Sequence, residues 1–312
     1  MTMLVCGSIA YDTIMVFRDQ FKSRILPEQV HILNVSFLVP EMRREFGGCA
    51  GNIAYSLKLL GDDPLIMATV GDDDASPYLD RLDRLGLSRA LVKRVEGSYT
   101  AQAFIITDLD GNQINAFHPG AMNSSHHNRV ADAPDVTLAI IAPDGREGML
   151  HHAEDLAAAK IPFIFDPGQQ LPMFSGDEVL RFLDLARYAC FNDYEAKLAC
   201  ERTGRSVDEL AERLEALIVT RGAEGSRIYA DGRHIDIPCV PSQAVIDPTG
   251  CGDAYRAGLL HGIARNWPWE RTGRLAAVMG SIKVASRGGQ NHTANRAEIA
   301  ERFTAAFGQA PW

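Results

Sequence analysis

Short apolar segments alternate with amphipathic segments along most of this 312-residue chain. The apolar segments have the length of buried strands, and the segments between them show helical periodicity. Parallel strands need a crossover that a helix supplies, so this alternation predicts an α/β fold with a mostly parallel central sheet and helices on both faces. We expect strands at residues 3–9, 65–69, 136–141, 161–165, 187–191, 217–220 and 245–246. We expect helices at residues 50–60, 75–85, 148–160, 177–185, 193–202, 207–216, 254–265, 271–286 and 296–307.

Some extended segments fall outside this alternation and predict a second, smaller sheet. Residues 13–17 and 30–38 form one pair, and residues 101–107 and 113–117 form another around a hairpin signal at 108–112. A further hairpin is expected at 227–229 and 234–237. We expect one domain over residues 1–312, with a discontinuous lid from about residues 13–44 and 98–118. The exposed edges of such a lid could pair two subunits into a homodimer.

Composition narrows the class of partner and the compartment. A net charge of −9 argues against nucleic acid or an anionic membrane as the main partner, and favours a small-molecule substrate. No apolar run is long enough to span a bilayer. The six cysteines are scattered without a C-x-x-C pair, which is typical of reduced thiols in a cytoplasmic protein.

The histidine pairs at 126–127 and 151–152 could suggest a metal site. Adjacent residues on a helix diverge and do not converge on one ion, so we expect both pairs to be solvated at the surface.

The stretch from Asp247 to Asp253 carries the strongest chemical signal. Gly250 and Gly252 flank Cys251 and leave backbone N–H groups uncovered where a helix is expected to begin. Such a helix start attracts anions, and a carboxylate there would repel a phosphate unless it accepts a proton from an attacking hydroxyl. Asp253 is therefore a candidate general base for phosphoryl transfer, although a helix cap is the commoner use of such an aspartate.

The pattern Asp-x-Thr-Gly-x-Gly-Asp at 247–253 resembles the second signature of the PfkB/ribokinase family of carbohydrate and nucleoside kinases. Two residues depart from the usual form, Pro248 and Cys251, but the glycines and the final aspartate remain. Gly47 and Gly48, followed by Asn52, resemble the first signature of the same family. The resemblance implies a ribokinase-like three-layer sandwich with a small β-sheet lid. It also implies transfer from ATP to an alcohol, with Asp253 as the base and the amides of Gly250, Cys251 and Gly252 stabilising the developing charge.

The resemblance extends to the nucleotide. Asn192 and Glu195 resemble the Asn-x-x-Glu motif of the family and would face the ATP phosphates and Mg²⁺, directly or through water. A helix cap with a solvated acid is the alternative interpretation. Four residues resemble the nucleotide loop, namely Thr220, Arg221, Gly222 and Gly225. Asp247 and Thr249 match the loop that contributes to a monovalent cation site in many members, so K⁺ is a further candidate.

The resemblance leaves the acceptor open among sugars, nucleosides and sugar phosphates. Asp12, Gly47, Gly48 and Asn52 would bind the ribose hydroxyls, with Ser8 and Ser36 nearby. Phe117 could stack on a purine or pack inside the lid, and Gln169 and Gln170 could pair with a base edge. This set is similar to that of bacterial adenosine kinases and favours adenosine.

Two alternatives stay open beside an adenosine kinase. One is a kinase for a free sugar such as ribose or fructose, and the other is a catalytically silent nucleoside- or sugar-binding protein on the same fold. Assays with adenosine, inosine, ribose and fructose would separate them. The position of Cys251 at a helix N-terminus predicts a lowered thiol pKa.

Overall fold

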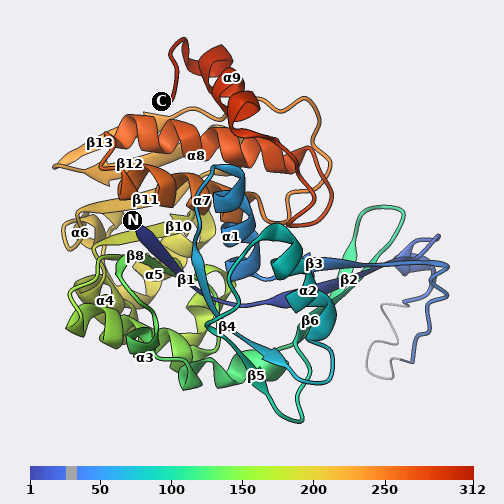
Figure 1. Ribbon diagram of the computed structural model, residues 1–312. Coiled ribbons are helices and arrows are strands. Elements are labelled where there is room, and N and C mark those ends of the chain that lie inside the picture. Colours follow the sequence, from blue (N-terminus) through green and yellow to red (C-terminus); the bar gives the residue numbers. More distant parts are fainter. Residues whose placement is uncertain (26–33) are drawn as a thin grey trace.

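The computed structural model describes residues 1–25 and 34–312, and within them the body is built around a nine-stranded sheet (Figure 1). Neighbouring strands pair in parallel except at one edge, where an antiparallel hairpin closes the sheet. In order across the sheet the strands are β13 (Arg233–Ile237), β12 (Ser226–Ala230), β11 (Ala216–Thr220), β10 (Tyr188–Asn192), β9 (Phe163–Phe165), β8 (Val136–Ile141), β1 (Thr2–Cys6), β4 (Leu65–Gly71) and β5 (Val92–Val95). The expected α/β class is confirmed.

Helices cover both faces of this sheet, because alternate strand residues point to opposite sides and both sides are apolar. Met3 and Val5 of β1 belong to one core, whereas Leu4 and Cys6 belong to the other. The first core is closed by α1 (Cys49–Leu59), α2 (Ser76–Leu85), α7 (Cys251–Ala264) and α8 (Trp269–Val284). The second is closed by α3 (Arg146–Ala158), α4 (Gly176–Leu185), α5 (Asp193–Thr203) and α6 (Val207–Ala211). Helix α9 (Arg296–Phe307) packs on α8.

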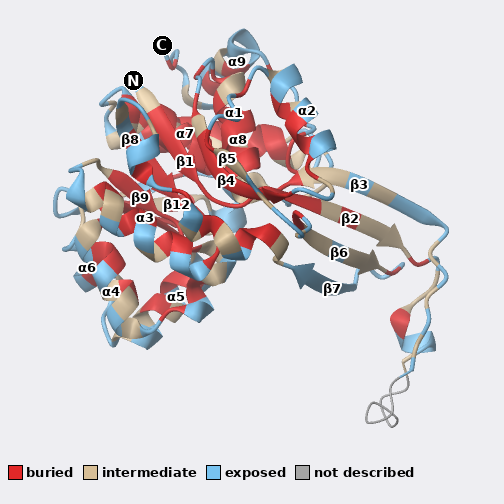
Figure 2. Ribbon diagram, turned by 60° about the horizontal axis from the view of Figure 1, so that its bottom comes forward, coloured by how far each residue is buried: buried red, intermediate tan, exposed pale blue. Residues whose placement is uncertain are grey.

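A four-stranded sheet projects from the body as the lid (Figures 1 and 2). Its strand order is β3 (Glu41–Gly47), β2 (Ala10–Val16), β6 (Ala101–Thr107) and β7 (Gln113–His118). The strands of the body are mostly buried, whereas every residue of β7 is exposed. Asp12 of β2 pairs directly with Glu45 of β3 and Ala103 of β6, and Ala103 pairs with Phe117 of β7. Directly paired residues share a face, so Asp12 and Phe117 lie on the same side of the lid.

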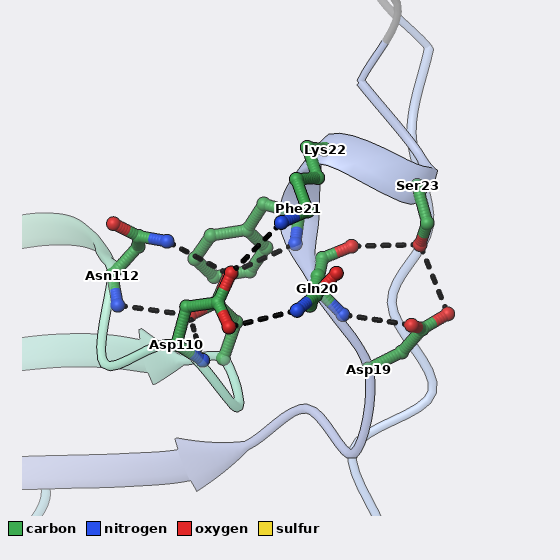
Figure 3. A network of polar contacts seen from close by, with 8 residues as sticks. Asp19, Gln20, Phe21, Lys22, Ser23, Asp110 and Asn112 are labelled. Atoms are coloured by element: carbon green, nitrogen blue, oxygen red, sulfur yellow. Dashed lines mark hydrogen bonds and ion pairs between the residues drawn. The ribbon is translucent and has the colours of Figure 1, made fainter.

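The far end of the lid is held by a polar network that includes Gln20, Asp110 and Asn112 (Figure 3). The Asp108 carboxylate accepts hydrogen bonds from the backbone amides of Phe21, Asp110 and Asn112 at 2.8–3.0 Å. Gln20 donates to Asp110 at 2.7 Å, which ties the same loop a second time. The hairpin predicted at 108–112 is therefore confirmed, and its turn also anchors a 3₁₀ turn (η1, Phe21–Ser23) from the β2–β3 connection.

Several expected elements are wrong or shifted. Residues 245–246 form no strand: Val245 is 81% exposed, and the amide of Ile246 donates to the carbonyl of Val284 at the end of α8. The strand expected at 30–38 lies partly outside the described residues, and 34–38 is not a strand; the lid strand β3 comes later. The helix expected at 207–216 ends at Ala211, and β5 was not anticipated.

The histidine pairs differ from expectation at one position. His152 is fully buried rather than solvated, because it shares the inner face of α3 with Met149 and Ala153. Burial lowers the pKa of His152 to about 4, so the ring is neutral near pH 7. His127 and His151 are exposed, as expected. Across the described residues, no helix is both long and apolar enough to cross a membrane.

Candidate active site

The site is formed at the carboxyl ends of the parallel strands, where loops from separate parts of the chain meet. Asn192 ends β10 and pairs in register with Thr220, which ends β11. Asp166 follows β9, and Ser8 follows β1. These four residues are far apart in the sequence but all lie at the carboxyl ends of the strands, on the side of the sheet next to the base of the lid.

Helix α7 begins at this edge without a side-chain cap. Gly250 is its N-cap residue and has a φ of 79°, a left-handed conformation that favours glycine. The amide of Cys251 donates to the carbonyl of Pro248 at 3.0 Å, so this amide is not free for an anion. Among the described residues, the amides of Gly250, Gly252 and Asp253 have no backbone partner. The expected amide-lined helix start is present, with Asp253 taking the place of Cys251 among the available donors.

Asp253 lies in the first turn of α7 and is held by a residue from α1. Asn52 donates through Nδ2 to Oδ2 of Asp253 at 2.8 Å. Gln290 donates to Oδ1 of Asn52 at 3.2 Å and to the Tyr78 hydroxyl at 2.7 Å. Tyr78 in turn donates to the carbonyl of Gly47 at 2.7 Å. This chain of hydrogen bonds fixes the Asn52 amide, so Asn52 orients the carboxylate.

The electrostatic surroundings raise the pKa of Asp253. Burial and the charge of Asp166 raise the pKa of Asp253 to about 6, against the opposing effects of the Asn52 hydrogen bond and the Arg256 charge. A base with a pKa in this range is ionised at neutral pH and can still accept a proton. The carboxylate is neither capping its own helix nor fully solvated, which distinguishes it from an ordinary first-turn acid.

The double glycine brings the backbone of the α1 start close to the lid. Gly48 has a φ of 85°, and a Cβ there would lie 2.5 Å from the amide nitrogen of Ala10. A Cβ on Gly47 would lie 2.5 Å from Oδ2 of Asp12. Only glycine fits at position 48, where the close atoms are backbone, and a side chain on residue 47 would displace the Asp12 carboxylate. Burial and the charges of Asp253, Asp247 and Glu45 raise the pKa of Asp12 to about 6, so Asp12 and Asp253 belong to one acidic cluster.

A buried ion pair lies below the start of α7. Arg256 is 5% exposed and donates through Nη2 to Asp166 at 2.8 Å. Its Nη1 lies 3.1 Å from the position that a Cβ on Gly252 would occupy, and its Nε is buried with no hydrogen-bond partner. The guanidinium thus places a permanent positive charge directly behind the α7 amides. Sequence reasoning missed Arg256, although its place one turn after Asp253 could have indicated it.

Asn192 and Glu195 form a capping box at the start of α5. The Asn192 side chain accepts from the Glu195 amide at 2.7 Å, and the Glu195 carboxylate accepts from the Asn192 amide at 2.8 Å. Glu195 is 7% exposed, and burial together with the charge of Asp166 raises its pKa. Their oxygen atoms suit Mg²⁺ but are already hydrogen-bonded, which fits contact with the ion through water. The described residues contain no cluster of three or more His, Cys, Asp or Glu side chains that could hold a metal alone.

The predicted nucleotide loop, residues 220–225, follows β11 as a tight turn. The amide of Arg221 donates to the carbonyl of Gly225 at 2.8 Å, and Gly222 and Gly225 both have positive φ. A Cβ on Gly225 would lie 2.1 Å from the carbonyl of Ile237, so this glycine is required. The Arg221 guanidinium pairs with Asp236 at 3.0 Å. The loop is adjacent to Asn192 because Thr220 and Asn192 are paired.

The residues expected to bind the base, and the two serines expected near the ribose, lie on separate segments of the chain. Phe117 is 51% exposed on the open face of the lid, so it does not pack inside the lid. Gln169 and Gln170 lie in a 3₁₀ turn (η5, Gly168–Met173) after Asp166, with Gln169 exposed. Ser36 is exposed in the connection before β3. The Ser8 hydroxyl already accepts from the amide of Cys49 at 3.1 Å, where it caps α1.

The expectation for Cys251 was wrong. Burial raises the pKa of its thiol to about 11, and the charges of Asp247 and Asp253 also oppose ionisation, against the opposite effect of the Lys283 charge. The helix start lowers a thiol pKa only where the sulfur faces the free amides. Cys251 is thus a poor target for thiol reagents.

Together, the layered fold, the sheet lid and an acid at an uncapped helix start define a phosphotransferase that acts on an alcohol. The model of the pfkB family carbohydrate kinases matches residues 8–296. The chain belongs to this family, and the resemblance seen in the two signatures is confirmed.

Several proteins similar to this chain are nucleoside kinases. The chain is 33% identical to the nucleoside kinase of Methanocaldococcus jannaschii over 86% of its length and 89% of that protein. It is 32% identical to the nucleoside kinase of Methanothermobacter thermautotrophicus over 99% and 97% of the two chains. Among solved structures, the nucleoside kinase of Burkholderia thailandensis in complex with inosine is similar with 56% identity and a TM-score of 0.91, covering 99% of both chains.

Proposed function

We propose that the protein is an ATP-dependent nucleoside kinase that transfers the γ-phosphoryl group to the ribose 5′-hydroxyl, with adenosine as its preferred acceptor. The observation that carries the proposal is Asp253, held by Asn52 at 2.8 Å at the uncapped start of α7. The nucleoside class is supported by the names of the three relatives above.

In the proposed mechanism, Asp253 accepts the proton of the 5′-hydroxyl as its oxygen attacks the γ-phosphorus. The bond from the γ-phosphorus to the bridging oxygen breaks, and ADP leaves. The amides of Gly250, Gly252 and Asp253 stabilise the charge on the transferred group, each by about 3–4 kcal/mol at most. Arg256 adds a fixed charge behind them, and its ion pair with Asp166 keeps the guanidinium in place.

The acceptor is held between the body and the lid. Asp12 accepts hydrogen bonds from ribose hydroxyls, with the backbone at Gly47 and Gly48 closing the floor below them. Phe117 shares the face of the lid that carries Asp12, which supports stacking on the base once the lid closes. Gln169 and Gln170 follow Asp166 and are available to pair with the base edge. Lid closure over the substrates excludes water and limits hydrolysis of ATP.

The nucleotide would lie along the ends of β10 and β11. Asn192 and Glu195 would hold Mg²⁺ through water, and the ion would neutralise phosphate charge. The rest of the nucleotide would bind to the turn after β11, formed by Thr220, Arg221, Gly222 and Gly225. Arg221 pairs with Asp236 near the protein surface and lies at this edge, so its guanidinium can reorient toward a phosphate.

A panel of acceptors tests the proposal. Initial rates with MgATP and adenosine, inosine, ribose or fructose should give the highest kcat/KM for adenosine. Phe117→Ala should raise the KM for adenosine by about tenfold, the value of one stacked base, and leave that for ribose unchanged. Leu109→Ala, at the lid tip and 66% exposed, is the matched control. A higher kcat/KM for ribose would favour the sugar kinase, and binding without turnover would favour a silent binding protein.

We also propose that the protein is a cytoplasmic homodimer. Met42, Phe104 and Ile114 are exposed on the face of the lid opposite to Asp12, and this apolar face suits a homodimer formed through the lid. The six free cysteines suit a cytoplasmic location. Sedimentation of the wild type and of Phe104→Asp would test the dimer: a wild type that sediments as a monomer contradicts it.

A further inference from the structure

Lys283, near the end of α8, is a fully buried lysine that the proposed mechanism does not use. Its side chain has 0% exposure, which is rare for an ammonium group. The ammonium donates to the backbone carbonyl of Asp247 at 2.8 Å and to that of Ser286 at 2.9 Å. Lys283 thus joins the loop that precedes Asp253 to the end of α8.

The position coincides with the place where a monovalent cation was expected. Asp247 was a candidate ligand, but both of its carboxylate oxygens accept backbone amides, from Thr249 at 2.9 Å and from Gly288 at 2.8 Å. The backbone carbonyl of Asp247 accepts the hydrogen bond from the Lys283 ammonium. The oxygen atoms of Asp247, one of the two residues expected to bind K⁺, are therefore already hydrogen-bonded.

An ammonium group and K⁺ carry the same charge and favour similar oxygen ligands, and backbone carbonyls serve both. We propose that the Lys283 ammonium takes the place of a monovalent metal ion. It fixes the Asp247–Gly250 loop, and turnover therefore needs no added K⁺. Lys283 is a positioning residue, since it acts on the α7 amides and Asp253 through this loop. The inference rests on the proposed kinase function only for its activity readout.

The surrounding charges agree with this role. Burial lowers the pKa of Lys283, whereas the charges of Asp247 and Asp253 favour its charged form. The pKa of Asp247 lies below its usual range despite burial, because the amides of Gly288 and Thr249 stabilise the carboxylate. His292 lies near the ammonium on the other side and is held neutral, since burial and the Lys283 charge lower its pKa to about 4. The positive charge of Lys283 thus offsets the negative charge of Asp247 in this loop.

The first test compares the wild-type protein in KCl, NaCl and tetramethylammonium chloride at equal ionic strength. We expect kcat and KM for adenosine and ATP to agree within about twofold, and the thermal midpoint to be the same in all three salts, because no cation binds the native site. Activation by K⁺ of tenfold or more, or a K⁺-specific rise in the thermal midpoint, would overturn the proposal. The thermal measurement remains informative even if the substrate assignment fails.

The second test removes the ammonium. Lys283→Ala leaves two carbonyls around an empty position, so its kcat should fall by tenfold or more in tetramethylammonium chloride and recover in KCl or NH₄Cl. K⁺ should also raise the thermal midpoint of Lys283→Ala. Lys283→Met fills the volume without charge and should be impaired in every salt. Lys197→Ala, whose side chain is 76% exposed on α5, is the control and should match the wild type.

Either of two results would contradict the proposal. One is a folded Lys283→Ala variant with wild-type kcat in tetramethylammonium chloride. The other is a folded Lys283→Ala variant whose kcat and thermal midpoint respond to no cation. If neither variant folds, as judged by circular dichroism, the wild-type salt comparison decides the proposal on its own.

Discussion

Two helix starts at the same edge of the sheet carry an acid at the same position and use it differently. At α5 the N-cap is Asn192, and Glu195 in the third helical position folds back to complete a capping box. At α7 the N-cap is Gly250, and Asp253 in the third helical position is held by Asn52 of another helix. The first arrangement satisfies the helix amides internally. The second leaves amides and a carboxylate without partners inside their own helix, as the catalytic role that we propose for α7 requires.

The largest effect is expected at the acid of α7. Asp253→Asn should lower kcat by about 10³–10⁴-fold, because proton transfer from the hydroxyl loses its base. The same change should stabilise the fold by about 1–2 kcal/mol at pH 7–8: the raised pKa means that the ionised Asp253 is disfavoured in the folded state. Single-turnover rates and urea unfolding measure the two effects. An active Asp253→Asn variant would contradict the role of Asp253 as the base. An inactive variant that is less stable than the wild type would mean that Asp253 stabilises the fold like an ordinary first-turn acid.

Giving α7 a side-chain cap should be the next most damaging change. Gly250→Ser places a hydroxyl where it can accept from the amides of Gly252 or Asp253, so we expect about a 100-fold loss of kcat. Backbone strain at a φ of 79° should cost a further 1–2 kcal/mol of stability, roughly. Gly204→Ser is the control, because Gly204 ends α5 with a φ of 65° and open space around it. Equal losses of activity in both variants would mean that strain, not capping, is responsible.

Removing the residue that holds Asp253 should shift the pH dependence. Asn52 stabilises the charged carboxylate, so Asn52→Ala should raise the pKa of Asp253 above about 6, by roughly one unit. The acid limb of kcat/KM then moves to higher pH. The loss is about fivefold at pH 6, approaches tenfold at lower pH and is small at pH 8. Asn52→Asp adds a like charge and should move the limb further. An unmoved limb would show that Asn52 does not act on the base.

The smallest effect is expected at the capped helix. Asn192→Ala should cost about 1 kcal/mol of stability, the usual value of an N-cap. Ser206→Ala removes the equivalent capping box of α6, away from the site, and should cost about the same. Only Asn192→Ala should also raise the KM for ATP, by about three- to tenfold, as expected for one lost hydrogen bond near the phosphates. Identical KM values in both variants would make Asn192 a cap and nothing more.

The parts of this site that the sequence could predict are local. Glycines at 250 and 252 before Asp253, or Ser206 three residues before Glu209, show a helix start within a few residues. The parts it could not predict depend on distant contacts. Arg256 pairs with Asp166, and Lys283 with Asp247, only because the fold brings separate strand ends together.

The misplaced elements have the same origin. Val245 and Ile246 are β-branched and suggest a strand, but no neighbouring strand is available there, and the segment packs on the end of α8. His152 looks polar and is buried because of the face of α3 on which it lies. The helix boundaries set by caps, such as Asn295 before α9, were predictable because the signal is carried by the cap itself.

The pH profile of kcat/KM for adenosine, measured on the wild type and on the residual activity of Asp253→Asn, tests the central claim most directly. Asp12 and Asp253 both have a pKa of about 6, so the wild type alone cannot say which one is the base. The account predicts that wild-type kcat/KM falls below about pH 6. It also predicts that the residual kcat of Asp253→Asn at saturating adenosine, which no longer depends on ribose binding by Asp12, is flat from about pH 5 to 7. An acid limb that persists near pH 6 in Asp253→Asn would assign the base to another group and contradict the account.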